Sequence, residues 1–200
     1  INGQDVGDLS TGSTLQDKLD TINSNVSGVE AAAITEMNAT TAGDGVVQGT
    51  NEVIFTLANV DGSSSVFEIR NTGSLEELAA KVNTVSAGQI EASINDDGTL
   101  RLNTDGASIT ITETGSGTAL SALGTGMATG AAQQAQLTLT AENGTDGITV
   151  TYTTGTDANV VGIDTRTSVG EISGRTALTA QDIEKGEVMI NGVEINTSDV

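Results

Sequence analysis

Two stretches of this chain follow nearly the same plan, the first from Thr11 to Ala33 and the second from Thr72 to Ser93. Each begins with Thr-Gly-Ser and continues with apolar residues at helical spacing. Each then passes an Asn and a Gly and reaches an apolar residue followed by Glu-Ala. Repeated supersecondary units are typical of modular, structural proteins and not of proteins built around one active site.

The first stretch contains an apolar stripe that predicts a helix of about three to four turns. The stripe consists of Leu15, Leu19, Ile22 and Val26. Ser13 with Gln16 fits a capping box at the start, and Gly28 fits a left-handed stop after the end. Such a short helix is not stable alone in water, so we expect it to pack on a sheet.

The second stretch predicts a helix of the same kind. Its stripe consists of Leu75, Leu78, Ala79 and Val82. Ser74 with Glu77 fits the same capping box, and Gly88 fits the stop. We expect the first residues of the two stripes, Leu15 and Leu75, to anchor their helices to a sheet.

Alternating β-branched segments predict strands on both sides of the second helix. The expected strands are 52–57, 65–70, 90–94, 99–103 and 108–112. Asp61-Gly62 and Asp97-Gly98 predict hairpin turns between the first two and between the next two. The order strand, strand, helix, strand, strand, strand predicts one helix lying on one antiparallel sheet over residues 50–127.

The C-terminal part is also expected to be rich in strands. Segments 136–140 and 147–153 predict a hairpin around Asn143-Gly144, and 163–172 is less regular. Further along we expect a helical turn at 179–185 and strands at 187–190 and 193–195 around Asn191-Gly192. Two segments rich in small residues, 39–49 and 115–133, are interpreted as connections between units.

The expected fold class is therefore α+β, mainly antiparallel β-sheet with short helices packed on it, in two or three small repeated units. The expected units are 1–49, 50–127 and 128–200. The chain has two Phe, one Tyr and no Trp among 200 residues, which favours small cores made from Val, Ile, Leu and Ala. The chain opens without Met and inside a motif, so we expect it to be a segment of a longer protein.

The charge and the missing residue types bear on function. The net charge of −20, from 27 acidic against 7 basic residues, argues against a nucleic-acid partner and against docking on an anionic membrane. The chain contains neither His nor Cys, which removes Ser-His-Asp and Cys-His catalysis and zinc-thiolate sites. A carboxylate pair could still cleave a glycosidic bond, but the few aromatic rings do not favour a sugar site. We expect no enzyme activity, no catalytic, cofactor-binding or metal-binding residues, and no cofactor.

The acidic pairs fit ordinary structural positions. Asp96-Asp97 lies in an expected turn, where Asp bonds the local main chain. Glu76-Glu77 lies in the expected first turn of a helix, where negative charge complements the helix dipole. Asp157-Ala-Asn159 resembles a calcium loop only faintly, and weak calcium binding remains an open alternative.

The Ile-Asn-Gly tripeptides at residues 1–3 and 190–192 give the chain a resemblance to the flagellin "IN" motif. In that motif an Ile-Asn-Gly hairpin precedes a helix with an Ile-Asn pair and then a Gly-Val-x-Ala strand. The segments that match are Ile1-Asn2-Gly3, Ile22-Asn23, Gly28-Val29-Glu30-Ala31, the partial copy at 75–92 with Val82-Asn83, and the opening of another copy at 178–200. The motif occurs in the outer domains of bacterial flagellins and of the filament cap (hook-associated) protein. The terminal helices by which flagellins polymerise have no counterpart here.

The resemblance implies a structural component of the bacterial flagellar filament: the surface-exposed, hypervariable outer domain of flagellin, extracellular and without the polymerising helices. Its partners would be other flagellin subunits, through regions absent here, and Ser and Thr residues could carry O-glycans. We expect the 200-residue chain alone to be a monomer. The alternatives are the outer domain of the filament cap protein, or a non-flagellar adhesin or calcium-stiffened surface module.

Overall fold

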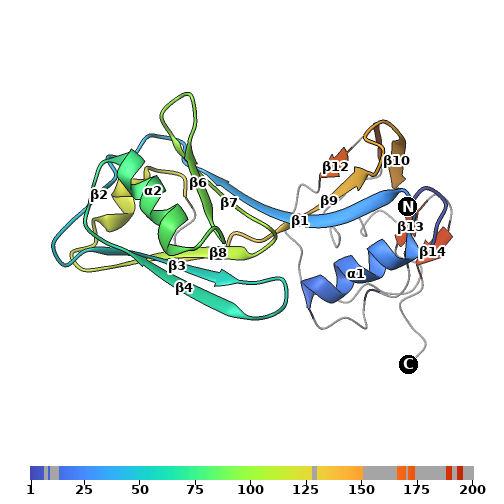
Figure 1. The fold of residues 1–200 in the computed structure, drawn as a ribbon, viewed down its shortest axis with the longest axis horizontal. Helices are drawn as coiled ribbons and strands as arrows, with labels where there is room; N and C mark the ends of the chain where they lie inside the picture. The colour runs from blue at the N-terminus through green and yellow to red at the C-terminus, as the bar shows by residue number, and fades with distance from the viewer. Residues whose placement is uncertain are drawn as a thin grey trace. The chain divides into compact units, whose positions relative to one another are not determined.

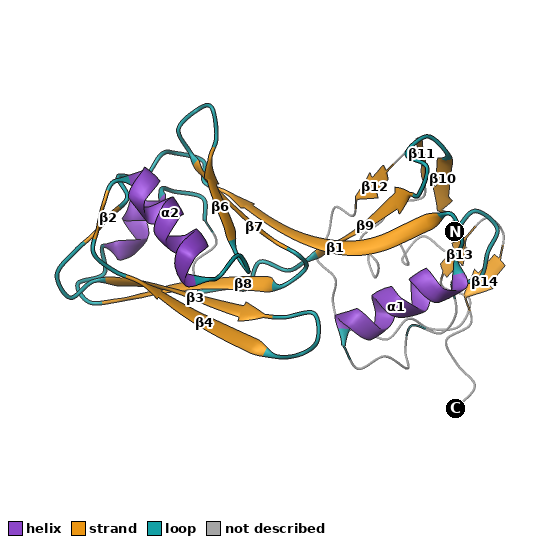
Figure 2. Cartoon of the chain, in the orientation of Figure 1, coloured by secondary structure: helices purple, strands orange, loops and turns teal. Residues whose placement is uncertain are grey.

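The protein has a mixed α+β fold made mainly of antiparallel sheets, with two short α-helices among its described residues, which confirms the expected fold class (Figure 1, Figure 2). The structure, a computed structural model, describes residues 1–6, 9, 14–127, 130–150, 166–169, 171–173, 188–190 and 193–195. Within this part of the chain, no helix is long and apolar enough to cross a membrane.

The elements follow one another in chain order as follows. They are α1 (Leu15–Asn25), β1 (Val29–Asn38), β2 (Val46–Val47), β3 (Glu52–Ala58), β4 (Ser64–Ile69), β5 (Thr72–Gly73), α2 (Leu75–Val85), β6 (Glu91–Ile94), β7 (Leu100–Thr104), β8 (Ser108–Thr114), the 3-10 helix η1 (Ala119–Leu123), β9 (Gln136–Ala141), β10 (Gly147–Val150), β11 (Arg166–Val169), β12 (Glu171–Ser173), β13 (Val188–Ile190) and β14 (Val193–Ile195).

The chain divides into two compact units, and one is inserted into the other. Unit 1 contains residues 1–34, 60–62 and 135–200, and unit 2 contains 35–59 and 63–134. This division differs from the three consecutive units expected at 1–49, 50–127 and 128–200. The reason is β1, which pairs with β9 along Val29–Ile34 and with β7 along Thr35–Asn38. These pairings join residues far apart in the chain, which a local pattern does not encode.

The described residues of unit 2 contribute strands to three sheets where the sequence predicted one, and the smallest is the pair β2 with β5. Strands β4, β3 and β8 form a three-stranded antiparallel sheet, whereas β6 and β7 pair with each other and β7 pairs with the end of β1. The hairpin pairings expected around Asp61-Gly62 and Asp97-Gly98 are both present. The expectation of a single sheet was wrong because β7 pairs with β1, outside the span of residues that the prediction considered.

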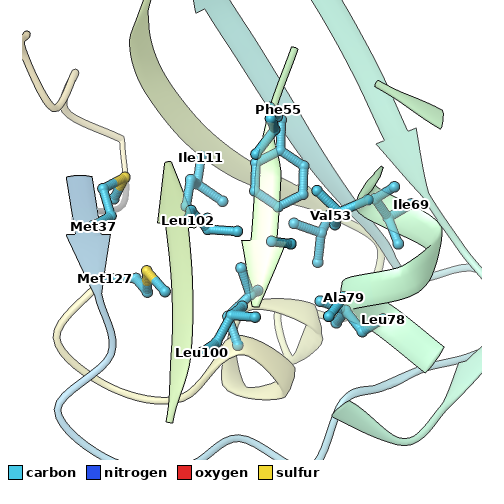
Figure 3. Close-up of a cluster of buried hydrophobic side chains, with 14 of the residues drawn as sticks. Met37, Val53, Phe55, Ile69, Leu78, Ala79, Leu100, Leu102, Ile111 and Met127 are labelled. Carbon is cyan, nitrogen blue, oxygen red and sulfur yellow. The ribbon is translucent and has the colours of Figure 1, made fainter. Parts of the chain in front are cut away.

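The core of unit 2 lies between these strands and α2. Figure 3 shows Phe55 of β3 and Ile111 of β8 in the same cluster as Leu102 of β7 and Leu78 of α2. All four apolar residues of the α2 stripe are buried, as predicted. Both Phe residues of the chain belong to this unit, Phe55 fully buried and Phe67 partly buried against the cluster.

Two segments were interpreted as connections, 39–49 and 115–133, but their described residues are packed parts of unit 2. A Cβ on Gly43 would lie 2.1 Å from the main-chain oxygen of Ala122, and a Cβ on Gly124 would lie 2.0 Å from that of Thr41. The N–H of Gly45 donates to the same Ala122 oxygen at 3.0 Å. The glycines therefore allow two main-chain segments to approach each other closely, and composition alone does not distinguish this role from a flexible link.

Unit 1 packs α1 against β1 and β9. Leu19 and Ile22 of α1 and the following Val26 are buried, whereas Leu15, expected to anchor the helix, is only partly buried. The other members of this core come from the N-terminal segment, both strands and β10: Ile1, Val6, Leu9, Val29, Ala31, Ala33, Ala135, Leu137, Leu139, Ala141, Ile148 and Val150.

The hairpin expected around Asn143-Gly144 is not formed. Strand β9 pairs with β1 on one side and with β12 on the other, so neither edge of β9 is free to pair with β10. Strand β10 pairs with β11 instead. The later hairpin is present, because Ile190 pairs with Val193 and Val188 with Ile195. Its turn residues Asn191-Gly192 and the helical turn expected at 179–185 lie outside the described residues.

Candidate functional site

The second repeated stretch contains a side chain that pairs with the main chain as a strand would. Asn83, in the last part of α2, donates its Nδ2–H to the carbonyl of Ala92 at 2.8 Å. Its Oδ1 accepts from the N–H of Ala92 at 2.7 Å. Both polar atoms of the carboxamide are thus used on one residue of β6.

The first repeated stretch contains the same arrangement. Asn23 of α1 donates to the carbonyl of Ala31 at 2.9 Å and accepts from the N–H of Ala31 at 2.6 Å. Ala31 lies in β1, which follows α1 as β6 follows α2. We call each Asn with its two hydrogen bonds an asparagine clamp.

Each clamp covers a strand edge. The N–H and C=O of one strand residue point to the same side, so Ala92 directs both toward Asn83 and away from β7. Strand β6 is the last strand of its sheet, and this side would otherwise present unpaired main-chain groups. An exposed strand edge can pair with another chain. Asn23 has the same relation to β1 at Ala31, on the side opposite β9.

The loops whose ends are joined by the two clamps differ in length. Asn23 and Ala31 are 8 residues apart, whereas Asn83 and Ala92 are 9 apart. The helices end at Asn25 and Val85 with C-caps Val26 and Ser86, so the expected glycine stops were wrong in position. Gly28 and Gly88 follow two residues after the caps, with left-handed backbone at φ of +80° and +84°. The extra residue lies after Gly88, where the second repeat reads Gly-Gln-Ile-Glu-Ala and the first reads Gly-Val-Glu-Ala. The clamp is therefore kept although the loop length changes.

The first helix begins one residue later than the sequence predicted. The N-cap of α1 is Thr14, whose Oγ1 accepts from the N–H of Asp17 at 3.1 Å, and Asp17 accepts from the N–H of Thr14 at 3.0 Å. The expected capping box of Ser13 with Gln16 was wrong. The error came from aligning the two Thr-Gly-Ser tripeptides, whereas the structure places Thr14 where the second repeat has Ser74.

The second helix begins where predicted, with one difference in its bonds. Ser74 is the N-cap and its Oγ accepts from the N–H of Glu77 at 3.2 Å. The return bond goes to the preceding residue, since the N–H of Gly73 donates to Glu77 Oε2 at 2.8 Å. The pKa of Glu76 lies below its usual value because its own main-chain N–H and then the Ser74 hydroxyl bond the carboxylate.

Side-chain amides hold the Ile-Asn-Gly turn at the start of the chain in place within unit 1. Asn2 and Gly3 have left-handed backbone with φ of 52° and 80°. Asn2 Oδ1 accepts from the N–H of Thr149 in β10 at 2.9 Å. Gln4 bonds both the N–H and the carbonyl of Ser27, just after α1.

The amino group of Ile1 lies at this turn. It donates to the Gln4 carbonyl at 2.8 Å, while the Ile1 side chain is buried in the core of unit 1. Burial lowers the pKa of this amino group to about 5, although the charge of Asp5 acts in the opposite direction.

The acidic pairs form no metal centre in the described part of the chain, where no three acidic side chains gather closely enough to hold an ion. Asp97 lies in the expected turn, and its Oδ1 accepts from the hydroxyl and the N–H of Thr99 at 2.6 and 3.0 Å. These bonds lower the pKa of Asp97, the Thr99 hydroxyl most of all. Asp157 and Asn159 lie outside the described residues.

Sequence reasoning named Asn23 and Asn83 as motif residues but did not predict what their side chains bond. It missed Gln4 and also Asn25, whose Nδ2–H donates to the Val6 carbonyl at 3.0 Å. No spacing rule marks these two residues, because each bonds main chain far away in the sequence, at separations of 23 and 19 residues. A signal for the clamps did exist: an Asn at the same place in both repeats followed by Gly five residues later.

No protein-family model matches this chain, and a search of curated proteins found no match for it.

Proposed function

We propose that this chain is a structural component of the bacterial flagellar filament, the surface-exposed outer domain of a flagellin. The observation that carries the proposal is the pair of asparagine clamps in two copies of one helix-and-strand unit. The residues of the clamps, Asn23 with Ala31 and Asn83 with Ala92, are the Asn and Ala positions of the IN motif that this sequence resembles. The motif residues thus share one hydrogen-bonded arrangement, and the likeness is not one of composition alone.

The chemistry of the chain agrees with this role. Covered strand edges and a net charge of −20 both oppose edge-to-edge pairing between copies that lie close together on a filament surface. The Asn and Gln side chains named above bond the main chain of the same protein. A domain of this kind gives shape and solubility, and the polymerising contacts would come from regions of the protein outside this chain.

Immunogold electron microscopy of the source bacterium tests the proposal directly. Antibodies raised against the 200-residue chain should label filaments along their whole length. A strain with these 200 residues deleted in frame should still assemble filaments that are not labelled. Label confined to the filament tip would instead assign the chain to the filament cap protein, and label on the cell surface away from filaments would assign it to an adhesin.

The calcium-stiffened module makes a separate prediction. A ligand present at 100 times its Kd adds about 2.7 kcal/mol to the free energy of unfolding. Calcium at millimolar concentration should therefore raise the melting temperature by several degrees if such a site exists. We expect the same melting temperature in calcium and in a chelator, and a rise of several degrees would replace the flagellar proposal with the calcium-stiffened alternative.

A further inference from the structure

We propose that Asn143-Gly144 is a site of spontaneous deamidation, in which the folded turn itself promotes conversion of Asn143 to aspartate and isoaspartate. The turn follows β9, and residues 142–147 are all exposed. The proposal rests on the hydrogen bonds of one side-chain carbonyl and is independent of the proposed function.

The carbonyl oxygen of the Asn143 side chain is held by two main-chain donors. Oδ1 accepts from the N–H of Thr145 at 3.1 Å and from the N–H of Asp146 at 2.9 Å. An Asn side chain that bonds the main chain two and three residues ahead is folded back over the peptide that follows it. In this turn that peptide contains the nitrogen of Gly144, the nucleophile of the reaction.

The reaction proceeds by ring closure and hydrolysis. The Gly144 nitrogen forms a bond to Cγ of Asn143 and gives its proton to a base from the solvent. Cγ–Nδ2 then breaks, and Nδ2 takes up a proton and leaves as ammonia. Water opens the resulting five-membered imide at one of its two carbonyl carbons, which breaks one C–N bond and yields either aspartate or isoaspartate. The co-reactant is water alone.

The two N–H donors act on the ring-closure step. Attack on Cγ places negative charge on Oδ1, and N–H groups already aimed at that oxygen stabilise the charge as in an oxyanion hole. Gly144 adds no Cβ beside the attacking nitrogen, and an ideal Cβ there would meet nothing within 4 Å. One bond opposes the reaction: the Gly144 N–H donates to the Ala141 carbonyl at 2.9 Å. The bond lies in an exposed turn, where local opening has a small free-energy cost.

Asn2-Gly3 provides an internal control with the same dipeptide. Asn2 Oδ1 accepts from the N–H of Thr149, which lies in β10, so its carboxamide is drawn away from the peptide that follows Asn2. The fold therefore favours reaction at Asn143 and opposes it at Asn2. Asn191-Gly192 lies outside the described residues.

The test compares the two sites in one sample. The folded 200-residue chain is incubated in mildly alkaline buffer made with heavy-oxygen water, and peptide mapping by mass spectrometry follows both dipeptides. We expect Asn143 to convert about tenfold faster than Asn2 or more, a ratio equal to about 1.4 kcal/mol of activation free energy. In denaturant the two rates should become similar. Equal rates in the folded chain, or a difference that persists in denaturant, would overturn the proposal.

Two glycine variants separate chemistry from strain. Gly144 and Gly98 have φ of +71° and +80°, and neither would bring a Cβ into contact with other atoms. We expect Gly144→Ala to slow conversion of Asn143 several-fold, because a Cβ then stands beside the attacking nitrogen. Gly98→Ala introduces similar backbone strain in the turn between β6 and β7 and should leave the rate at Asn143 unchanged. An equal effect of both variants would mean that strain, and not the turn at Asn143, controls the reaction.

Discussion

Asn83 and Ala92 are joined by two hydrogen bonds, 2.8 and 2.7 Å long, that use both polar atoms of one carboxamide on both main-chain groups of one strand residue. An Asn side chain offers one donor and one acceptor on the same side, in the arrangement that a neighbouring strand residue would present. A hydrophobic residue of similar size could fill the space but would leave the N–H and C=O of Ala92 without partners.

The first prediction concerns this clamp. Asn83→Ala should lower the free energy of unfolding by about 1–3 kcal/mol, because two hydrogen bonds are lost and two partly buried main-chain groups lose their partners. Urea denaturation followed by circular dichroism measures the change. Thr84→Ala, at the exposed neighbouring position, is the matched control and should change stability by less than about 0.5 kcal/mol. If both variants behave alike, the clamp contributes nothing to stability.

The same variant predicts a change in association. The parent chain should be monomeric, since the clamp covers the β6 edge and the net charge of −20 is repulsive. Asn83→Ala exposes the edge, and light scattering at high salt, where charge repulsion is screened, should detect concentration-dependent association. A parent chain that itself forms fibres or a stable oligomer would contradict the assigned role of the clamp.

The two helices should differ in how much a leucine of the apolar stripe contributes to stability. Leu78 is 0% exposed, and Leu78→Ala should cost about 2–5 kcal/mol, as buried Leu to Ala changes do. Leu15 is only partly buried, so Leu15→Ala should cost clearly less, about 1 kcal/mol. The comparison requires thermal or urea unfolding of both variants. Equal losses would show that α1 is packed more tightly than the structure describes.

The close approach of two main-chain segments predicts an effect of Gly43. Its φ does not lie in the left-handed region, so Gly43→Ala causes little backbone strain. The added Cβ would still meet the Ala122 main chain at 2.1 Å, and rigid main chain cannot move aside as a side chain can. We expect a loss of about 3 kcal/mol. Gly73→Ala is the control: its Cβ would meet the flexible Glu77 carboxylate at 3.4 Å, and its effect should be small.

The amino group of Ile1 predicts a pH dependence. Its pKa is about 5 in the folded chain against an ordinary value of 8.0 in an unfolded chain, so the unfolded chain binds more protons between these values. Stability should therefore fall as the pH is lowered from about 8 to about 5 and should depend little on this group below that range. The chain has no His, so no side chain of ordinary pKa titrates there. N-terminal acetylation should remove the slope, and a slope that survives it must come from another group.

Local patterns in the sequence predicted most of the elements and few of the long-range relations. Strands β3, β4, β6, β7 and β8 and the α2 stripe were predictable because alternation and helical spacing are local properties, whereas the two-residue strands β2 and β5 were not predicted. The sequence did not predict that β1 pairs with both β7 and β9, because nothing near Val29–Asn38 specifies partners so distant along the chain. Alignment of the two repeats gave one wrong prediction, because the match between the Thr-Gly-Ser tripeptides placed the N-cap of α1 at Ser13 and not at Thr14. The recurring Asn of the two repeats marked the position of the clamps, but its bonding partner Ala31 or Ala92 follows only from the packing of helix on strand.

The extra residue between Gly88 and Ala92 has a practical consequence. The two repeats show that the loop accepts either length while the Asn at one end and the Ala at the other stay joined. Loop-closure entropy rises only slowly with length, and a Cβ at Gly88 would meet nothing within 4 Å. A short peptide tag or epitope inserted between Gly88 and Gln89 should therefore be displayed at the surface without loss of the fold, whereas the same insertion beside Gly43 would force two main-chain segments apart.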